Sequence, residues 1–115
     1  AIRRRQMMAS RARMMAAVPD ADVVVTNPTH YAVALKYSPE LAAPQVVAQG
    51  MDLVALKIRE IASESRVAIV PDPPLARALH ASVEVGDHIP EEMYEAVAQV
   101  LAFVYRTANQ RAAAA

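Results

Sequence analysis

Two short segments in the first half of the chain have the hydrophobic and polar patterns of β-strands. Residues 22–27 (DVVVTN) form a β-branched run, and residues 30–37 (HYAVALKY) place every second side chain on the same face. The tetrapeptide Asn27-Pro28-Thr29-His30 joins the two runs, and Asn followed by Pro favours the first two positions of a type I turn. The pattern therefore predicts a β-hairpin that turns at residues 27–30.

Two further apolar segments predict two more strands. Residues 45–49 (QVVAQ) give a weak third strand that ends at Gly50. Residues 67–70 (VAIV) are apolar at every position, which is typical of a strand covered on both faces. We therefore expect a mixed sheet of about four strands.

Helical signals separate and flank these strands. Residues 2–18 contain good helix formers without Gly or Pro, and Asp52 is the predicted N-cap of a helix that reaches about Ser65. Pro73-Pro74 opens a short helix, and Pro90 begins the last one. The core face of that last helix is predicted to consist of Met93, Val97, Val100, Leu101 and Val104. The element order predicts an α/β fold, a mixed sheet of about four strands packed with about four helices.

Charge divides the chain into a basic beginning and an acidic remainder. The net charge is zero, but the first thirteen residues carry five arginines and no acid precedes Asp20. The basic residues are Arg3, Arg4, Arg5, Arg11 and Arg13. An arm of this kind can meet anionic lipid headgroups, nucleic acid or an acidic partner. The arm lacks interleaved aromatic residues and a reading module, so we expect no nucleic-acid partner. Contact with a membrane surface and a solvated helix without a partner both stay open.

The length of 115 residues suits one folded domain. We expect a basic N-terminal linker helix at 1–19, the folded domain at 20–108 and a flexible Ala-rich tail at 109–115. No apolar run approaches the roughly 20 residues that a membrane span requires. The absence of Cys excludes disulfides and thiolate metal sites.

The three histidines are the remaining candidates for a metal site. His30, His80 and His88 have no helical i, i+4 spacing and no accompanying acidic cluster. We therefore expect neither a metal nor another cofactor, and we expect His80 and His88 to be surface residues.

The bond between Asn27 and Pro28 suggests a chemical reaction. Proline has no backbone N–H, so the usual deamidation of Asn through the next backbone nitrogen is closed. The reverse attack stays open: the Asn27 side-chain nitrogen attacks the backbone carbonyl of Asn27, forms a succinimide and expels the Pro28 nitrogen. His30 is the nearby group that can move protons near neutral pH, and Thr29 can hydrogen-bond the developing oxyanion or hold the turn.

Asn-Pro is also a common way to open a turn, and in most proteins this bond is inert. The residues alone therefore leave two classes open. One is a self-cleaving module, and the other is a scaffold or docking domain whose Asn-Pro turn does nothing.

The stretch of residues 27–35, Asn-Pro-Thr-His-Tyr-Ala-Val-Ala-Leu, resembles the signature of the FlhB/YscU family of type III secretion proteins. Further segments resemble the family in the same order along residues 2 to about 106. They are Ala17-Val18-Pro19, Asp22-Val23-Val24-Val25-Thr26, Ala43-Pro44 with Gly50 and Asp52, Ile58-Arg59-Glu60-Ile61-Ala62, Pro74-Leu75-Ala76-Arg77-Ala78-Leu79, Ile89-Pro90-Glu91-Glu92 and Val100-Leu101-Ala102-Phe103-Val104-Tyr105.

The resemblance implies a domain on the cytoplasmic face of the bacterial inner membrane, joined through residues 1–18 to a membrane domain. It implies a single self-cleavage between Asn27 and Pro28, after which the pieces stay together because strand 22–27 remains paired. The cut form would let export switch from rod and hook subunits to filament subunits. The implied partners are other export-gate proteins, export substrates and the hook-length control protein. Tyr31 and the ALKY run of residues 34–37 look flagellar, and a virulence secretion system is the alternative.

Overall fold

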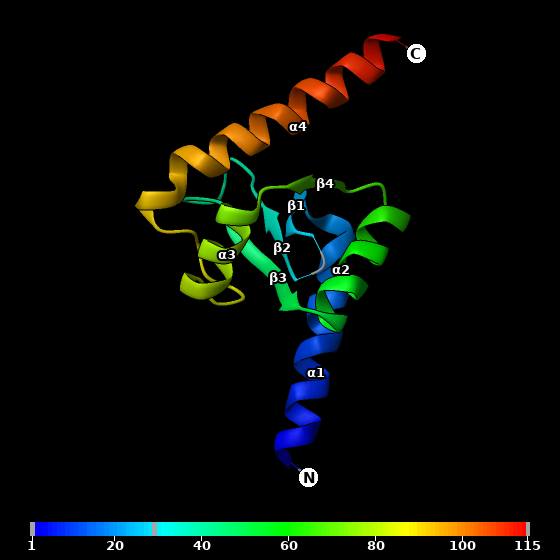
Figure 1. Ribbon diagram of the computed structural model, residues 1–115, viewed down its shortest axis with the longest axis vertical. Helices are drawn as coiled ribbons and strands as arrows, with labels where there is room; N and C mark the ends of the chain where they lie inside the picture. Colours follow the sequence, from blue (N-terminus) through cyan, green and yellow to red (C-terminus); the bar gives the residue numbers. More distant parts are fainter. Residues whose placement is uncertain (1, 29, 115) are drawn as a thin grey trace.

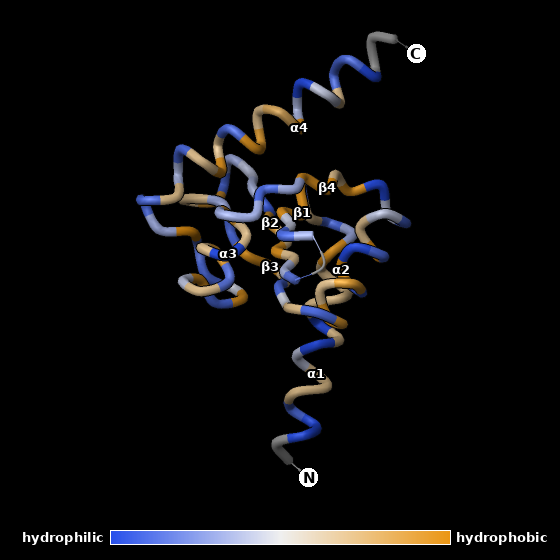
Figure 2. The backbone as a smooth tube through the Cα atoms, in the orientation of Figure 1, coloured by the Kyte–Doolittle hydropathy of each residue, from blue (hydrophilic) through white to orange (hydrophobic). Residues whose placement is uncertain are grey.

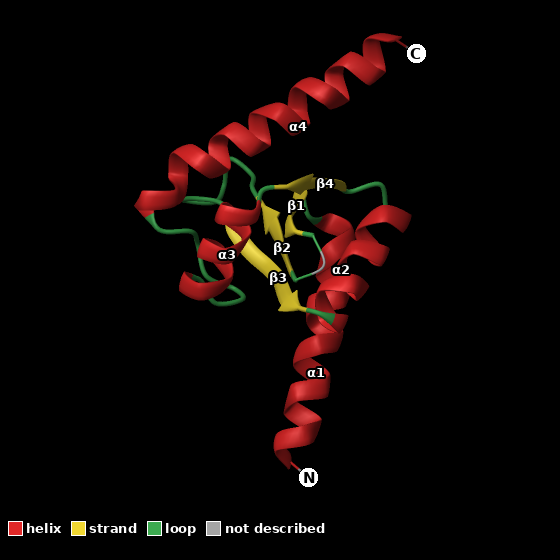
Figure 3. Cartoon of the chain, viewed as in Figure 1, coloured by secondary structure: helices red, strands yellow, loops and turns green. Residues whose placement is uncertain are grey.

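The computed structural model describes residues 2–28 and 30–114, which form a sheet with helices on both faces (Figures 1 and 3). The strands are β1 (Val23–Asn27), β2 (Tyr31–Lys36), β3 (Gln45–Met51) and β4 (Ala68–Pro71). The helices are α1 (Ile2–Ala17), α2 (Leu53–Glu64), α3 (Pro73–Ser82) and α4 (Tyr94–Ala114), with short 3₁₀ turns at Val18–Asp20 and Glu91–Met93. The predicted α/β class is confirmed.

The strand order across the sheet is β3-β2-β1-β4. β2 is antiparallel to both β1 and β3, whereas β4 is parallel to β1. β1, β3 and β4 therefore run in the same direction, and their carboxyl ends lie along the same end of the sheet. The hairpin turn between β1 and β2 lies at that end.

Two hydrophobic cores form, one on each face of the sheet. Val23 and Val25 of β1 face the core under α3 and α4, while Val24 faces the core under α2 and the end of α1. All three valines are fully buried. Figure 2 shows the apolar residues gathered at the sheet between these helices. β1 therefore has a neighbouring strand on each side and a core on each face, as does β2.

The expectation that residues 67–70 form a strand covered on both faces is wrong. β4 lies at the edge of the sheet, and its residues alternate between partly buried and exposed. Ile69 keeps 37% of its surface exposed. α2 packs mainly over β2 and β3, so it leaves the β4 edge partly open.

The helix ends agree only in part with the predicted signals. The Asp72 carboxylate caps α3 by accepting a hydrogen bond from the Leu75 N–H, at 3.3 Å. Asp52 precedes α2 as predicted, but its side chain makes no capping hydrogen bond and its φ of 53° lies in the left-handed region. The predicted side-chain cap at Asp52 is therefore wrong. α4 continues to Ala114, and the flexibility expected for residues 109–115 stays a prediction.

Gly50 is needed where β3 turns into α2. A Cβ atom added to Gly50 would overlap the Val54 side chain. We expect Gly50→Ala to lower the free energy of unfolding by about 1–3 kcal/mol, the usual cost of overpacking. Urea denaturation measures the change, and Val54→Gly supplies the control because it removes both Val54 atoms, Cγ1 and Cβ, that a Cβ at residue 50 would overlap. If Gly50→Ala costs as much in the Val54→Gly background as in the parent, the overlap is not the cause.

Candidate functional site

The turn of residues 27–30 closes the β1–β2 hairpin. Asn27 ends β1 and pairs with Tyr31, the first residue of β2. The His30 backbone N–H donates to the Asn27 carbonyl oxygen at 2.9 Å, which closes the predicted four-residue turn. Asn27 is half-buried, whereas Pro28 and His30 are exposed. Thr29 lies outside the described residues.

The hydrogen bond from His30 falls on the carbonyl of the Asn27–Pro28 peptide. A donor aimed at this oxygen polarises the carbonyl and favours any negative charge that develops on it. The turn exposes Pro28 to water, so a proton can reach its nitrogen if the bond opens. This geometry suits attack on the Asn27 carbonyl carbon, the reaction expected from the sequence.

Two backbone groups from outside the hairpin hold the residues on either side of the turn. The Asp52 N–H, at the junction of β3 and α2, donates to the His30 carbonyl oxygen at 2.9 Å. The Asp72 N–H, at the junction of β4 and α3, donates to the Thr26 carbonyl oxygen at 2.8 Å. Neither contact was predicted from the sequence. The strand order brings these donors to the turn, because it places the carboxyl ends of β1, β3 and β4 at the same end of the sheet.

A contact between two side-chain rings lies next to the turn. The rings of Tyr31 and His80 lie with their centroids 4.7 Å apart, tilted by 38°. His80 is half-buried on α3, so the expectation that it is a surface residue is wrong, while His88 is exposed as expected. His80 is half-buried because α3 packs on the same face of β2 to which Tyr31 belongs. In the described part of the chain, no group of three or more His, Cys, Asp or Glu residues is arranged to hold a metal ion.

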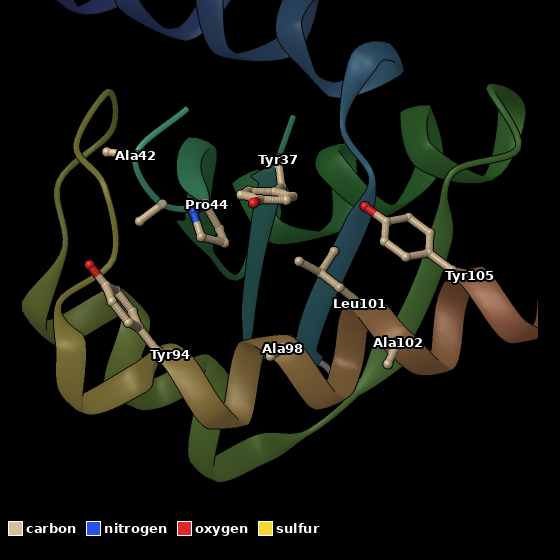
Figure 4. A pocket seen from close by; sticks show the side chains of 9 residues that line it. Tyr37, Ala42, Pro44, Tyr94, Ala98, Leu101, Ala102 and Tyr105 are labelled. Atoms are coloured by element: carbon tan, nitrogen blue, oxygen red, sulfur yellow. The ribbon is translucent and has the colours of Figure 1, made fainter. Parts of the chain in front are cut away.

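An apolar groove, which we call the α4 groove, opens at the end of the sheet away from the turn of residues 27–30 (Figure 4). It encloses about 420 Å³ between α4 and the segment that joins β2 to β3. Its lining residues are Tyr37, Ala42, Ala43, Pro44, Tyr94, Ala98, Leu101, Ala102 and Tyr105. The three tyrosines are among the exposed large side chains of the domain. The groove was not predicted, because its two walls are far apart in the sequence.

Asp22, just before β1, links the first part of the chain to the α4 groove. Its carboxylate accepts a hydrogen bond from the Tyr37 backbone N–H at 2.7 Å. Burial, followed by the effects of the Asp22 carboxylate and of Tyr37, raises the pKa of the Tyr105 phenol. Residues on both sides of the Asn27–Pro28 bond therefore shape this groove.

The basic residues of the arm lie along α1, which projects away from the sheet (Figure 1). Arg4, Arg5, Arg11 and Arg13 are exposed, and the side chain of Arg3 lies outside the described ones. The end of α1 packs on the domain through Met14 and Met15. Among the described helices, none is both long and apolar enough to cross a membrane.

Comparison with protein families matches residues 1–104 to the model described as the FlhB HrpN YscU SpaS family. The chain is 54% identical over 113 residues to the flagellar biosynthetic protein FlhB of Escherichia coli (strain K12), covering 97% of this chain and 30% of that protein. It is 52% identical over 107 residues to FlhB of Bacillus subtilis (strain 168), covering 92% of this chain and 30% of that protein. The chain thus spans about a third of the length of these curated relatives.

Solved structures agree with these matches. The cytoplasmic domain of FlhB from Shewanella putrefaciens superposes with a TM-score of 0.86 at 51% identity, over 90% of this chain and 80% of that one. A mutated C-terminal domain of EscU superposes with a TM-score of 0.77 at 33% identity, over 79% of this chain and 92% of that one. The motif in the turn, the sheet around it and these relatives together place the chain in the FlhB/YscU family, most similar to its flagellar branch.

Proposed function

We propose that this chain is the cytoplasmic domain of a flagellar type III export component that cuts its own backbone between Asn27 and Pro28. The observation that carries the proposal is the hydrogen bond from the His30 N–H to the Asn27 carbonyl oxygen. It supplies an oxyanion donor at the bond that the family motif marks. In the whole protein, the domain would lie on the cytoplasmic face of the bacterial inner membrane.

The proposed step is an intramolecular acyl transfer. The Asn27 side-chain nitrogen attacks the backbone carbonyl carbon of Asn27, and a C–N bond closes the five-membered succinimide. The peptide bond to Pro28 breaks, the Pro28 nitrogen takes up a proton, and the side-chain amide loses one. Water then opens the succinimide. The two pieces together weigh one water more than the intact chain.

The turn residues divide the work of this step. The exposed His30 imidazole would carry a proton from the amide to the departing Pro28 nitrogen, directly or through water. The His30 backbone N–H would stabilise the oxyanion, with Thr29 as a second donor or as a support of the turn. Because Asn27 is consumed, the reaction occurs once per molecule and is not enzymatic turnover.

The cut would change which proteins the apparatus exports. β1, at the end of the piece of residues 1–27, lies between β2 and β4, so the cut domain would keep its fold while its surface at the turn changes. We propose that this change permits the switch from rod and hook subunits to filament subunits. The hook-length control protein and the other export-gate proteins are the proposed partners in the switch.

Export substrates are the partners that best fit the α4 groove. A protein exported in an unfolded state exposes apolar side chains, and the groove offers an apolar floor with tyrosines at its rim. We propose that a short apolar segment of a hook or rod subunit docks between Pro44 and Leu101.

Ala98→Glu tests this docking directly, because Ala98 is exposed and lines the groove. A carboxylate on this apolar surface should weaken the binding of a purified hook subunit by about 10-fold or more, as measured by isothermal titration calorimetry. Ala96→Glu is the matched control, since Ala96 is exposed on α4 but does not line the groove. Equal loss of affinity in both variants would argue against the groove.

The cleavage itself is tested on the purified chain under denaturing conditions. We expect pieces corresponding to residues 1–27 and 28–115 after incubation at neutral pH. A chain that stays intact would instead favour the alternative of a scaffold with an inert turn. Complementation separates the flagellar proposal from its alternative. A protein that carries this domain should restore export in a flagellated strain lacking its flagellar counterpart, and not in a strain lacking the counterpart of a virulence secretion system.

A further inference from the structure

The turn of residues 27–30 is not held by its own hairpin alone. Thr26, one residue before Asn27, has its carbonyl oxygen bonded by the Asp72 N–H at 2.8 Å. His30, at the other end of the turn, has its carbonyl oxygen bonded by the Asp52 N–H at 2.9 Å. A hairpin turn normally projects beyond the sheet, where only its own closing bond restrains it. Here a neighbouring segment holds it on each side.

The two contacts are equivalent in construction. Each donor residue follows the carboxyl end of a strand that runs parallel to β1, and each immediately precedes a helix packed on the sheet. Asp72 follows β4 and starts α3, while Asp52 follows β3 and starts α2. The position of the turn is thereby tied to two helices on opposite faces of the sheet.

The backbone at Asp52 is unusual in a way that bears on its contact. Its φ of 53° and ψ of −113° lie in a region that residues other than glycine rarely occupy. Such conformations persist where the surrounding structure enforces them, and they cluster at functional sites. The Asp52 side chain does not cap α2. The Asp52 backbone N–H, in contrast, bonds the His30 carbonyl oxygen and thereby links the junction of β3 and α2 to the turn.

We propose that the backbone N–H groups of Asp52 and Asp72 position the turn for the scission between Asn27 and Pro28. This inference rests on the proposed self-cleavage. The cyclisation requires the side-chain nitrogen to approach its own carbonyl carbon along a narrow path. The Asp72 contact restrains the Thr26–Asn27 peptide, which directly precedes that carbonyl. The Asp52 contact restrains the carbonyl of His30, the residue whose N–H donates to the Asn27 oxygen.

The role belongs to the backbone and not to the aspartate carboxylates. Removing the N–H alone needs an ester in place of the amide, which malic acid supplies at any aspartate position without changing the side chain. The chain has no Cys, so total synthesis with ligation at alanine positions can introduce it.

The matched control lies at the opposite end of the hairpin. The Asp22 N–H donates to the Leu35 carbonyl oxygen at 2.8 Å, far from the turn. An ester at residue 22 removes a bond of the same kind, from the same residue type, in the same sheet. It should therefore lower the stability of the fold about as much as an ester at 52 or 72.

The experiment compares four synthetic chains that are uncut when made: the parent and the esters at 22, 52 and 72. Each is refolded from denaturant, its stability is measured by urea denaturation, and fragments are followed by mass spectrometry. We expect the esters at 52 and 72 to slow cutting by about 10-fold or more, and the ester at 22 to leave the rate within about 2-fold of the parent. A change in stability alone would affect all three esters alike.

The outcomes separate this inference from the proposed function. If the parent cuts and the esters at 52 and 72 cut as fast as the ester at 22, the positioning role is wrong and the self-cleavage stands. An ester at 72 that slows cutting while the ester at 52 does not would overturn the role of Asp52. A parent chain that stays uncut overturns both proposals.

Discussion

The Asn27→Ala chain should yield no fragment that ends at residue 27, however long it is incubated at neutral pH. Alanine has no side-chain nitrogen, so the nucleophile of the proposed cyclisation is missing. The His30 N–H and the exposed His30 imidazole would still be present, but they would have no attacking group to assist. Mass spectrometry over a time course, beside the unmodified chain, gives the readout.

The substitution should leave the fold in place, which makes a loss of cutting interpretable. Asn27 is half-buried at the last position of β1, and its backbone makes the ladder and turn contacts. Loss of one side-chain hydrogen bond would cost about 1 kcal/mol, against a typical domain stability of roughly 5–15 kcal/mol. Fragments ending at residue 27 from a folded Asn27→Ala chain would show that another group attacks.

Val24→Asp should prevent residues 1–27 from staying with residues 28–115 once the bond is cut. Val24 is fully buried on the face of β1 that packs under α2. A carboxylate there would lose its water without gaining a partner, at a cost of about 4 kcal/mol or more. That corresponds to roughly a thousandfold weaker association, which size-exclusion chromatography of the refolded pieces would detect as separation.

Met8→Asp is the control for this prediction. It changes an apolar residue to aspartate on the same piece, but Met8 lies on α1 with 66% of its surface exposed. The pieces carrying Met8→Asp should therefore elute together, as the unmodified pieces should. Co-elution of the Val24→Asp pieces would mean that contacts other than the enclosed strand hold the two parts.

The hairpin and its turn were predictable because their signals are local. A β-branched run marks residues 22–27, alternating side chains mark residues 30–37, and Asn-Pro marks the turn between them. The turn motif also carried the family resemblance. All of this depends on residues that are adjacent in the sequence, so no knowledge of the rest of the fold is needed.

The surroundings of the turn could not be predicted in the same way. An apolar run such as residues 67–70 does not say whether its strand lies inside a sheet or at its edge, and here it lies at the edge. The contact of His80 with Tyr31 and the backbone bonds from Asp52 and Asp72 join segments that are distant in the sequence. They depend on strand order, which local patterns do not encode.

The central claim is that the Asn27 side chain cuts the backbone at Pro28, and intact-mass spectrometry during refolding of an initially uncut chain tests it most directly. We expect the piece of residues 28–115 to appear together with a piece of residues 1–27 that is at first one water lighter than the free acid. That mass belongs to the succinimide, and it should rise by one water as the ring opens. A chain that keeps its full mass, or a piece of residues 1–27 that carries a free acid from the first time point, would contradict the account.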